Sequence, residues 1–147
     1  MRSILSCVRT AVLGFVLAAP PAFAASGYDY SDSWWTPTES GWGLQLVQQR
    51  DIVFATLYVY GADGTPRWYS GALAFTGLTA QAHTPNYEGD LWLTAGPWFG
   101  APAFAPSAVV YRKVGTMRVA GESMTRAALV YTVDGIAVQK TIERITF

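Results

Sequence analysis

The chain has 147 residues, of which 51% are hydrophobic and 14% aromatic, and its 10 basic and 10 acidic residues cancel at neutral pH. This balance argues against a nucleic-acid partner, because a nucleic-acid surface needs a basic excess. A single histidine excludes a multi-histidine metal site, and a single cysteine excludes a disulfide within the chain. We therefore expect no metal and no cofactor.

The first 24 residues have the features of a secretory signal peptide. Arg2 and Arg9 flank the start, an apolar run follows, and residues 22–24 form a small-x-small cleavage pattern. We place cleavage after Ala24, with cleavage after Ala25 as the alternative. The run is too short to span a bilayer, and no later segment is typical of a transmembrane helix. Residues 25–147 suit a single domain, which we expect to be periplasmic or secreted.

The rest of the chain has the pattern of antiparallel strands. Short blocks rich in Val, Ile, Thr, Tyr and Trp are separated by Gly, Asp, Asn and Pro. The predicted strands lie near 42–49, 52–60, 67–75, 78–84, 88–95, 108–120, 124–133 and 136–146. Because the connections are short, neighbours in sequence should be neighbours in space. We expect an all-β fold, a single antiparallel meander of about eight strands that forms a closed or nearly closed barrel. A β-sandwich is the alternative.

Two predicted turns, at 50–51 and 63–64, sort the side chains of the first three of these strands into two faces. The second turn pairs Val59 with Trp68. The predicted core face comprises Trp42, Leu44, Leu46, Val53, Ala55, Leu57, Val59, Trp68, Ala72 and Ala74. The opposite face comprises Val47, Phe54, Thr56, Tyr58, Tyr60, Tyr69, Leu73 and Phe75. Such an apolar outer face should be covered by a loop, another chain or a ligand.

The last hairpin has a type I′ turn candidate at Asp134-Gly135. This turn pairs Leu129 with Lys140 and brings Arg144 onto the same apolar face. A cation among core positions needs a partner, since burying it alone is costly. Glu39 is a candidate partner for either cation. In the same register Tyr131 faces Val138.

Residues 34–43, WWTPTESGWG, carry three tryptophans in a short stretch. One interpretation is that Trp34, Trp35 and Trp42 fill one end of the barrel, with Gly41 and Gly43 turning the chain into the first strand. The other is an aromatic platform for a sugar, an aryl compound or a lipid. Trp42 is expected in the core. Trp34 and Trp35 precede the predicted strand, so they are the freer pair, and at most one faces a given pocket.

A second aromatic segment, GPWFGAPAFAPS, follows residue 95. Pro97, Pro102 and Pro106 prevent regular strand pairing. Trp98, Phe99 and Phe104 are nevertheless strongly apolar. We expect either a lid or plug packed on the barrel, or a binding loop.

The WW-x-P-x-E-S-G-W-G pattern at 34–43 resembles a motif of small secreted proteobacterial domains of uncharacterised function. Eight of the ten positions of the motif are defined. YVYGADGTPRWYSG at 58–71 and YTVDGIAVQKTIERITF at 131–147 are also similar to that family. The resemblance implies one β-rich extracytoplasmic domain, alone or appended to a larger secreted protein. It supplies no catalytic residue.

The remaining candidate residues point away from catalysis. By strand alternation His83 shares a polar face with Thr79 and Gln81, and we interpret it as a surface histidine. No serine lies in a G-x-S-x-G elbow, which argues against a Ser-His-acid site. The acidic pairs Asp29 with Asp32 and Glu88 with Asp90 lack the spacing of a calcium loop, and we interpret them as turn and surface residues.

We therefore expect a non-enzymatic binding or interaction module with an aromatic-rich site. Its partner would be a small molecule, a glycan or an envelope protein, and the module a monomer or weak homo-oligomer. One alternative is a hydrolase of envelope glycans with Glu39 or Glu88 as acid, and another is a self-associating accessory domain. The predicted ligand-binding residues are Trp34, Trp35, Glu39, Trp42, Trp98, Phe99, Lys140 and Arg144.

Overall fold

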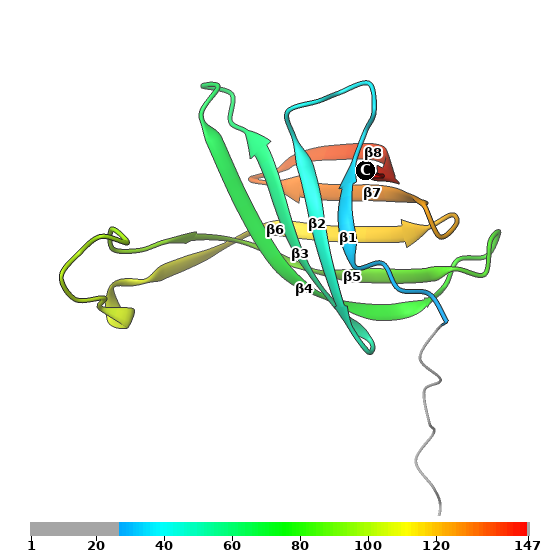
Figure 1. The fold of residues 1–147 in the computed structure, drawn as a ribbon, viewed down its shortest axis with the longest axis horizontal. Coiled ribbons are helices and arrows are strands. Elements are labelled where there is room, and N and C mark those ends of the chain that lie inside the picture. Colours follow the sequence, from blue (N-terminus) through cyan, green and yellow to red (C-terminus); the bar gives the residue numbers. More distant parts are fainter. Residues whose placement is uncertain (1–26, 147) are drawn as a thin grey trace, which may run out of the picture.

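The computed structural model describes residues 27–146, which form a closed barrel of eight antiparallel strands in chain order (Figure 1). The strands are β1 (Asp32–Trp35), β2 (Gly43–Gln49), β3 (Ile52–Tyr60), β4 (Pro66–Leu78), β5 (Pro85–Ala95), β6 (Val110–Gly121), β7 (Arg126–Val133) and β8 (Ile136–Arg144), with a 3-10 turn, η1 (Pro106–Ala108), between β5 and β6. The predicted all-β meander and closed barrel are confirmed. The predicted signal peptide, residues 1–24, lies outside the described residues.

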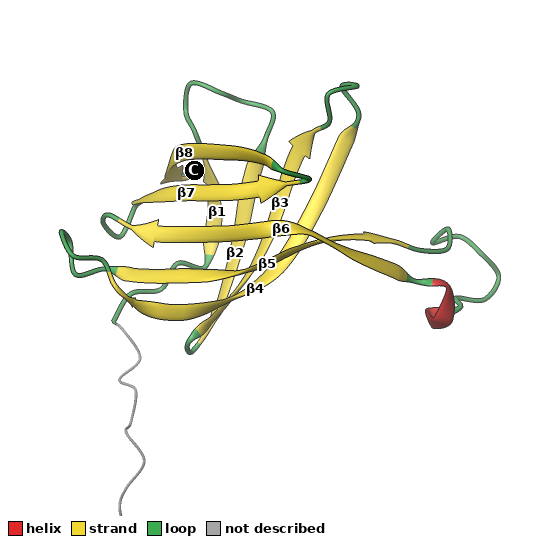
Figure 2. Cartoon of the chain, turned by 180° about the vertical axis from the view of Figure 1, so that it is seen from behind, coloured by secondary structure: helices red, strands yellow, loops and turns green. Residues whose placement is uncertain are grey.

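The meander places the connections alternately at two ends of the barrel. The turns at 50–51, 79–84 and 122–125 lie at one end, together with the segment that precedes β1. The connections at 36–42, 61–65 and 134–135 lie at the other end, where the β5–β6 hairpin also leaves the barrel (Figures 1 and 2). We call the first the closed end, since the buried Tyr30 and Trp34 fill it, and the second the open end, since it contains a cavity.

Strands β2, β3 and β4 cross β5 to β8 at a steep angle (Figure 1). Two glycines allow β4 and β5 to approach closely. A Cβ on Gly71 would lie 2.4 Å from the carbonyl oxygen of Asp90, and a Cβ on Gly89 would lie 2.4 Å from that of Ala72. Both contacts are with backbone atoms, which cannot move aside as a flexible side chain could.

The predicted β2–β3 register is confirmed, with Leu44 opposite Leu57, but the β3–β4 register is wrong by one residue. The structure pairs Val59 with Arg67. The connection is a five-residue loop, 61–65, whose ends are joined by a hydrogen bond of 2.9 Å from the Gly61 N–H to the Thr65 carbonyl. The Asp63 carboxylate accepts the Thr65 hydroxyl and N–H, and these bonds lower the pKa of Asp63 to about 2.

A one-residue shift exchanges the two faces of β4. Tyr69 and Leu73 are buried in the barrel, whereas the sequence placed them outside. Trp68 is 59% exposed on the outer surface, and Ala72 and Ala74 are exposed as well. These three assignments to the core were wrong. The outward positions of Val47, Phe54, Tyr58 and Tyr60 are confirmed by their exposure.

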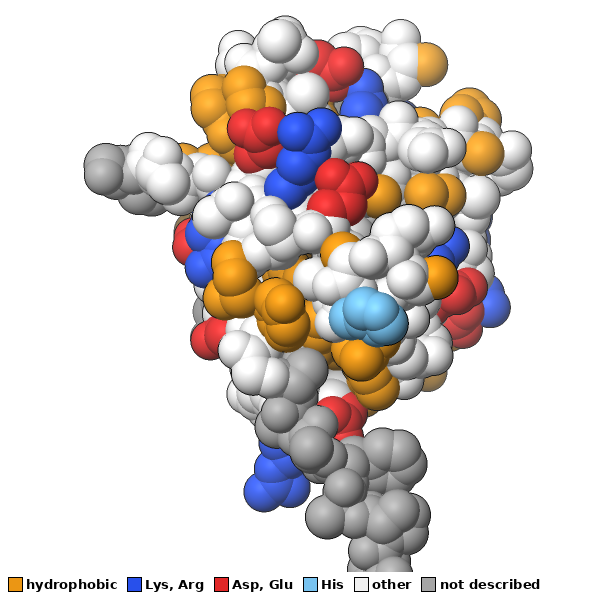
Figure 3. Space-filling model, turned by 90° about the vertical axis from the view of Figure 1, so that its right-hand side faces the viewer, with side chains coloured by type: hydrophobic (Ala, Val, Ile, Leu, Met, Phe, Trp, Pro, Cys, Tyr) orange, Lys and Arg blue, Asp and Glu red, His pale blue; other side chains and the backbone are white. Residues whose placement is uncertain are grey.

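Two further strand predictions need correction. The predicted strand at 78–84 does not form, because β4 runs on to Leu78 and a turn follows it. In this turn Thr79 and Thr84 are joined by a backbone hydrogen bond of 2.7 Å, and His83 takes a φ of 51°. His83 is exposed there, as expected of a surface histidine, and is the pale blue side chain in Figure 3. Strand β1 was not predicted at all.

We expect Gly71→Ala to lower the free energy of unfolding by about 1–3 kcal/mol, because the added methyl group meets the Asp90 carbonyl and overpacks the crossing. Gly27→Ala is the control, since no atom lies within 4 Å of the new Cβ there. Urea denaturation of both variants measures the difference. Equal stabilities would show that the crossing tolerates a side chain.

Candidate functional site

The closed end is sealed by Tyr30 and Trp34. Trp34 has 0% exposed surface, and its Nε1–H donates a 3.0 Å hydrogen bond to the Tyr30 carbonyl. The centroids of the two rings lie 5.7 Å apart. The buried Tyr30 hydroxyl reaches across the barrel and donates to the Ser123 carbonyl at 3.2 Å. Trp34 is therefore part of the core and offers no surface to a ligand, contrary to its prediction as one of the freer pair.

Arg144 of β8 lies over the face of Trp34, with the guanidinium carbon 5.2 Å from the ring centroid. The guanidinium also lies 3.3 Å from the Asp32 carboxylate and donates to the Asp29 carbonyl at 2.7 Å. Tryptophan is the strongest cation–π partner among the side chains. The inward cation that the sequence predicted is thus neutralised by Asp32 and covered by Trp34.

Lys140, four residues earlier on β8, takes part in a second arrangement of the same kind. Its ammonium group lies 5.7 Å from the Trp42 ring centroid and forms an ion pair with Glu39. The same Glu39 oxygen accepts the Trp42 Nε1–H at 3.1 Å. The hydrogen bond from Lys140 is the main cause that lowers the pKa of Glu39. The prediction that Glu39 pairs with one of the two cations is confirmed for Lys140, while Arg144 pairs with Asp32.

These two arrangements fasten the start of the barrel to its last strand. Strand β1 meets β8 through only two backbone pairs, Trp34 with Arg144 and Trp35 with Glu143. Trp35 alternates to the other side of β1 from Trp34 and is half-buried. We call the six side chains that add to this joint the tryptophan clasp: Asp32, Trp34, Glu39, Trp42, Lys140 and Arg144.

The open end contains a cavity of about 380 Å³ in the mouth of the barrel. Its walls include the apolar side chains Val59, Val133 and Val138 and the rings of Tyr69 and Tyr131. Burial is the main cause that raises the pKa of Tyr131, with smaller contributions from the nearby Glu39 and Tyr69. Within residues 27–146, no side chain or backbone group hydrogen-bonds to the Tyr131 hydroxyl, and this hydroxyl is not among the buried unpaired atoms. The hydroxyl therefore has exposed surface, on a side chain that lines the cavity.

The rim of this cavity carries charges that cancel in pairs. Arg67 lies 3.1 Å from Asp63, and Asp134, which also lines the cavity, forms an ion pair with Arg112 of the neighbouring strand β6. The Asp63 hydrogen bond is the main cause that raises the pKa of Arg67, and a bond to the Tyr69 side chain adds to it. Because each cation has a carboxylate beside it, the rim favours neither an anionic nor a cationic molecule.

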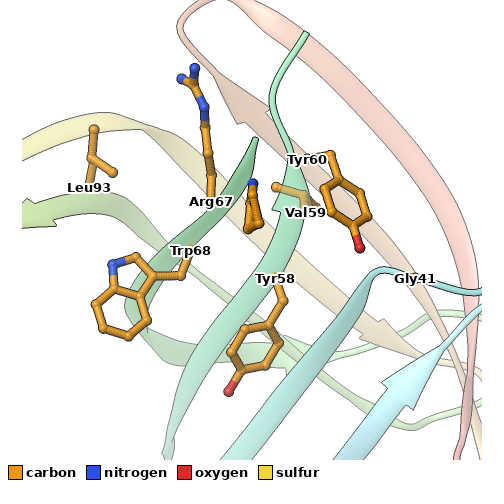
Figure 4. A pocket seen from close by; sticks show the side chains of 8 residues that line it. Gly41, Tyr58, Val59, Tyr60, Arg67, Trp68 and Leu93 are labelled. Carbon is orange, nitrogen blue, oxygen red and sulfur yellow. The ribbon is translucent and has the colours of Figure 1, made fainter. Parts of the chain in front are cut away.

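A second hollow, of about 490 Å³, adjoins the mouth on the outer surface and shares Val59, Tyr60 and Arg67 with it. Figure 4 shows the rings of Tyr58 and Trp68 side by side on neighbouring strands at this hollow. The two residues are direct cross-strand partners, and both are exposed. Together they form an aromatic surface beside the mouth.

The structure separates seven of the eight predicted binding residues into three places, and the eighth, Trp35, lies half-buried on the other side of β1 from Trp34. Trp34 and Arg144 lie at the closed end, Glu39, Trp42 and Lys140 lie at the joint between the 36–42 loop and β8, and Trp98 and Phe99 lie at the tip of the β5–β6 hairpin (Figure 2). The aromatic 97–106 loop is thus not a plug packed on the barrel.

Sequence reasoning missed Tyr69 and Tyr131 as candidate site residues. The register error at 61–65 placed Tyr69 on the wrong face. The pairing of Tyr131 with Val138 was predicted and is confirmed, so the sequence contained a signal for one wall of the cavity.

Comparison with models of protein families, with curated proteins and with solved structures found no match. Among residues 27–146, no three His, Cys, Asp or Glu side chains are grouped so that they could hold a metal ion. Within the same residues, no helix has the length and hydrophobicity needed to cross a membrane. Asp90, considered together with Glu88 in the sequence, forms an ion pair of 2.6 Å with Lys113.

We expect Arg144→Met to lower the free energy of unfolding by about 1–3 kcal/mol, since it removes the cation from Trp34 and leaves Asp32 unpaired. Arg118→Met is the matched control, because Arg118 is exposed on β6 and lies outside the clasp. Thermal and urea unfolding measure both variants. An equal loss in the two would contradict the role assigned to the clasp.

The closed end also predicts a loss of stability at alkaline pH. Burial raises the pKa of Tyr30 to about 12, above the ordinary value of 10.0, so the neutral phenol is favoured in the folded state. Its contribution to stability should be complete below pH 10 and should be lost as the pH rises toward 12. Tyr30→Phe should start about 1 kcal/mol less stable, because the bond to Ser123 is absent, but should decline less steeply over this range. Unfolding curves between pH 9 and 12 test this, and parallel declines would contradict it.

Proposed function

We propose that the protein is an extracytoplasmic, non-enzymatic binding module that holds one small, neutral, largely apolar or aromatic molecule at the open end of the barrel. The observation that carries this proposal is the mouth cavity, which has apolar walls and the accessible Tyr131 hydroxyl. Its volume of about 380 Å³ is in the range of small-molecule sites, which combine apolar walls with a few placed polar groups.

The two ends of the barrel support a one-sided site. Trp34 and Tyr30 fill the closed end, so a ligand would reach the interior only through the mouth. An eight-stranded barrel is just wide enough either to be filled by side chains or to hold one small ligand. Side chains fill the closed end, and the cavity at the mouth leaves room for one small ligand.

The chemistry of the mouth supports a neutral ligand. The charges of Arg67 and Arg112 are already satisfied by carboxylates, and a charged ligand would have to displace them. The Tyr131 hydroxyl would supply a hydrogen bond to a hydroxyl or carbonyl group of the ligand. A longer ligand would continue onto the aromatic surface of Tyr58 and Trp68, where rigid rings provide contact area at low entropic cost.

The extracytoplasmic location rests on the predicted signal peptide and on the resemblance at 34–43, and both stay predictions. The hydrolase alternative has less support. A general acid needs a raised pKa, whereas the Lys140 ion pair lowers the pKa of Glu39. Glu88, the other carboxylate considered, is exposed on β5 and lines neither hollow.

Filling the mouth should abolish binding of a neutral apolar probe. The fluorescent amine N-phenyl-1-naphthylamine should bind the purified protein with one-to-one stoichiometry. Val138→Trp should weaken this binding by about tenfold or more, since the indole occupies the cavity. Gln139→Trp is the control, because the next residue of β8 points to solvent and adds the same ring outside.

Fluorescence titration gives both affinities, and circular dichroism confirms that the variants are folded. If Val138→Trp does not fold, Val133→Trp fills the same cavity from β7. Native mass spectrometry of protein purified gently from its own host should show a single adduct that is lost in the same variant. Unchanged probe affinity in a folded, filled variant would refute the proposal.

A further inference from the structure

The β5–β6 hairpin extends beyond the body of the barrel. The pairing of β4 with β5 ends at Ser70 and Trp92, whereas β5 and β6 stay paired with each other as far as Ala95 and Val110. Figures 1 and 2 show the hairpin projecting sideways, with its loop and η1 far from every other element. The Trp92 and Tyr111 rings, 5.8 Å apart, pack edge to face along its two arms.

The projecting part carries no charge and exposes large apolar side chains. Residues 91–111 contain no Asp, Glu, Lys or Arg. Trp98 is 68% exposed, Phe99 95% and Phe104 61%. The rings of Trp98 and Phe99 contact each other but no core residue, with centroids 5.9 Å apart. So large an apolar surface at a tip is typical of a segment that enters an apolar phase or meets a partner.

The shape and backbone of the tip favour a lipid surface over a protein partner. The tip is a narrow projection, so a fluid phase can surround it on all sides (Figures 1 and 2). Pro97, Pro102 and Pro106 have no N–H to satisfy, and three of the remaining loop N–H groups are bonded within the loop, those of Ala101, Ala108 and Val109. Tryptophan is also one of the two side chains, with tyrosine, that are enriched at the membrane–water interface.

We propose that the tip of the β5–β6 hairpin, residues 96–109, inserts into the interface of a lipid bilayer. This inference does not rest on the ligand proposed for the mouth. The paired charges Asp90 with Lys113 and Arg112 with Asp134 lie at the base of the hairpin and limit the depth of insertion. Because these cations are already neutralised, the apolar side chains provide the affinity, and anionic lipid adds little.

The experiment is co-sedimentation of the protein with phosphatidylcholine vesicles, with and without 30% phosphatidylglycerol, at low and high salt. The wild-type protein should bind both vesicles with affinities within about threefold of each other, and salt should change them little. The double variant Trp98→Ser with Phe99→Ser should lose about tenfold or more in partitioning, since two buried rings are removed. Phe54→Ser is the control: it removes a ring that is 49% exposed on the barrel wall and that lines neither the mouth cavity nor the outer hollow, and it should bind as the wild type does.

A conservative variant identifies which part of the protein contacts lipid. Trp98→Phe keeps an apolar ring and should keep vesicle binding. Vesicles with brominated acyl chains should quench the wild-type tryptophan fluorescence, and this quenching should largely disappear in Trp98→Phe. The other five tryptophans lie outside the tip, at positions 34, 35, 42, 68 and 92.

The proposal would be overturned by no binding of wild-type protein to either vesicle, by equal loss in the Phe54 control, or by quenching that survives in Trp98→Phe. Binding that requires the anionic lipid would also contradict it, since the apolar tip would then not be the source of affinity. The mass of the protein in size-exclusion chromatography without lipid tests the other possible occupant of the tip, a second copy of the chain. A dimer that the double variant dissolves would assign the hairpin to self-association instead.

Discussion

The structure depends on how the first strand of the barrel is joined to the last. Strand β1 has four residues and shares two backbone pairs with β8, which is a weak seam by itself. The clasp adds two ion pairs and two cation–π contacts, each built on a tryptophan of the 34–43 motif and a cation of β8. Without this joint, β1 and β8 would be exposed sheet edges, and unpaired edges favour association with other strands. The tryptophans therefore act mainly by closing the barrel.

The same joint makes the two ends of the barrel different. At the closed end, Trp34 leans toward Tyr30 and fills the interior. Toward the open end, Glu39 holds Lys140 beside Trp42, so the 36–42 loop is fastened to β8 instead of folding into the mouth. The mouth next to it keeps its volume because its wall side chains are valines and tyrosines that line the space without filling it. The motif that suggested a binding platform therefore lies beside the mouth cavity and forms none of its walls.

The sequence predicted the strand register correctly where two strands are joined by a two-residue turn. The turns at 50–51 and 134–135 gave correct registers, and with them the inward position of Lys140. It failed at 61–65, where the hydrogen bonds between Asp63 and Thr65 stabilise an odd-numbered loop that a single Asp-Gly signal does not reveal. One residue of error moved Trp68 into the core and Tyr69 out of it. The cavity itself could not be predicted, because an empty volume depends on packing across strands that are distant in the sequence.

The two candidate surfaces are built on different parts of the barrel, which makes their roles separable. The mouth is lined by residues of β3, β4, β7 and β8, whereas the tip belongs to the β5–β6 hairpin alone. Leu93 connects the two surfaces: it lines the second hollow, beside the mouth, and lies on β5, which continues into the tip. A tip held at a lipid surface would therefore bring the aromatic surface of Tyr58 and Trp68 near that lipid. An apolar ligand dissolves poorly in water, so a site beside a bilayer meets it at a much higher local concentration.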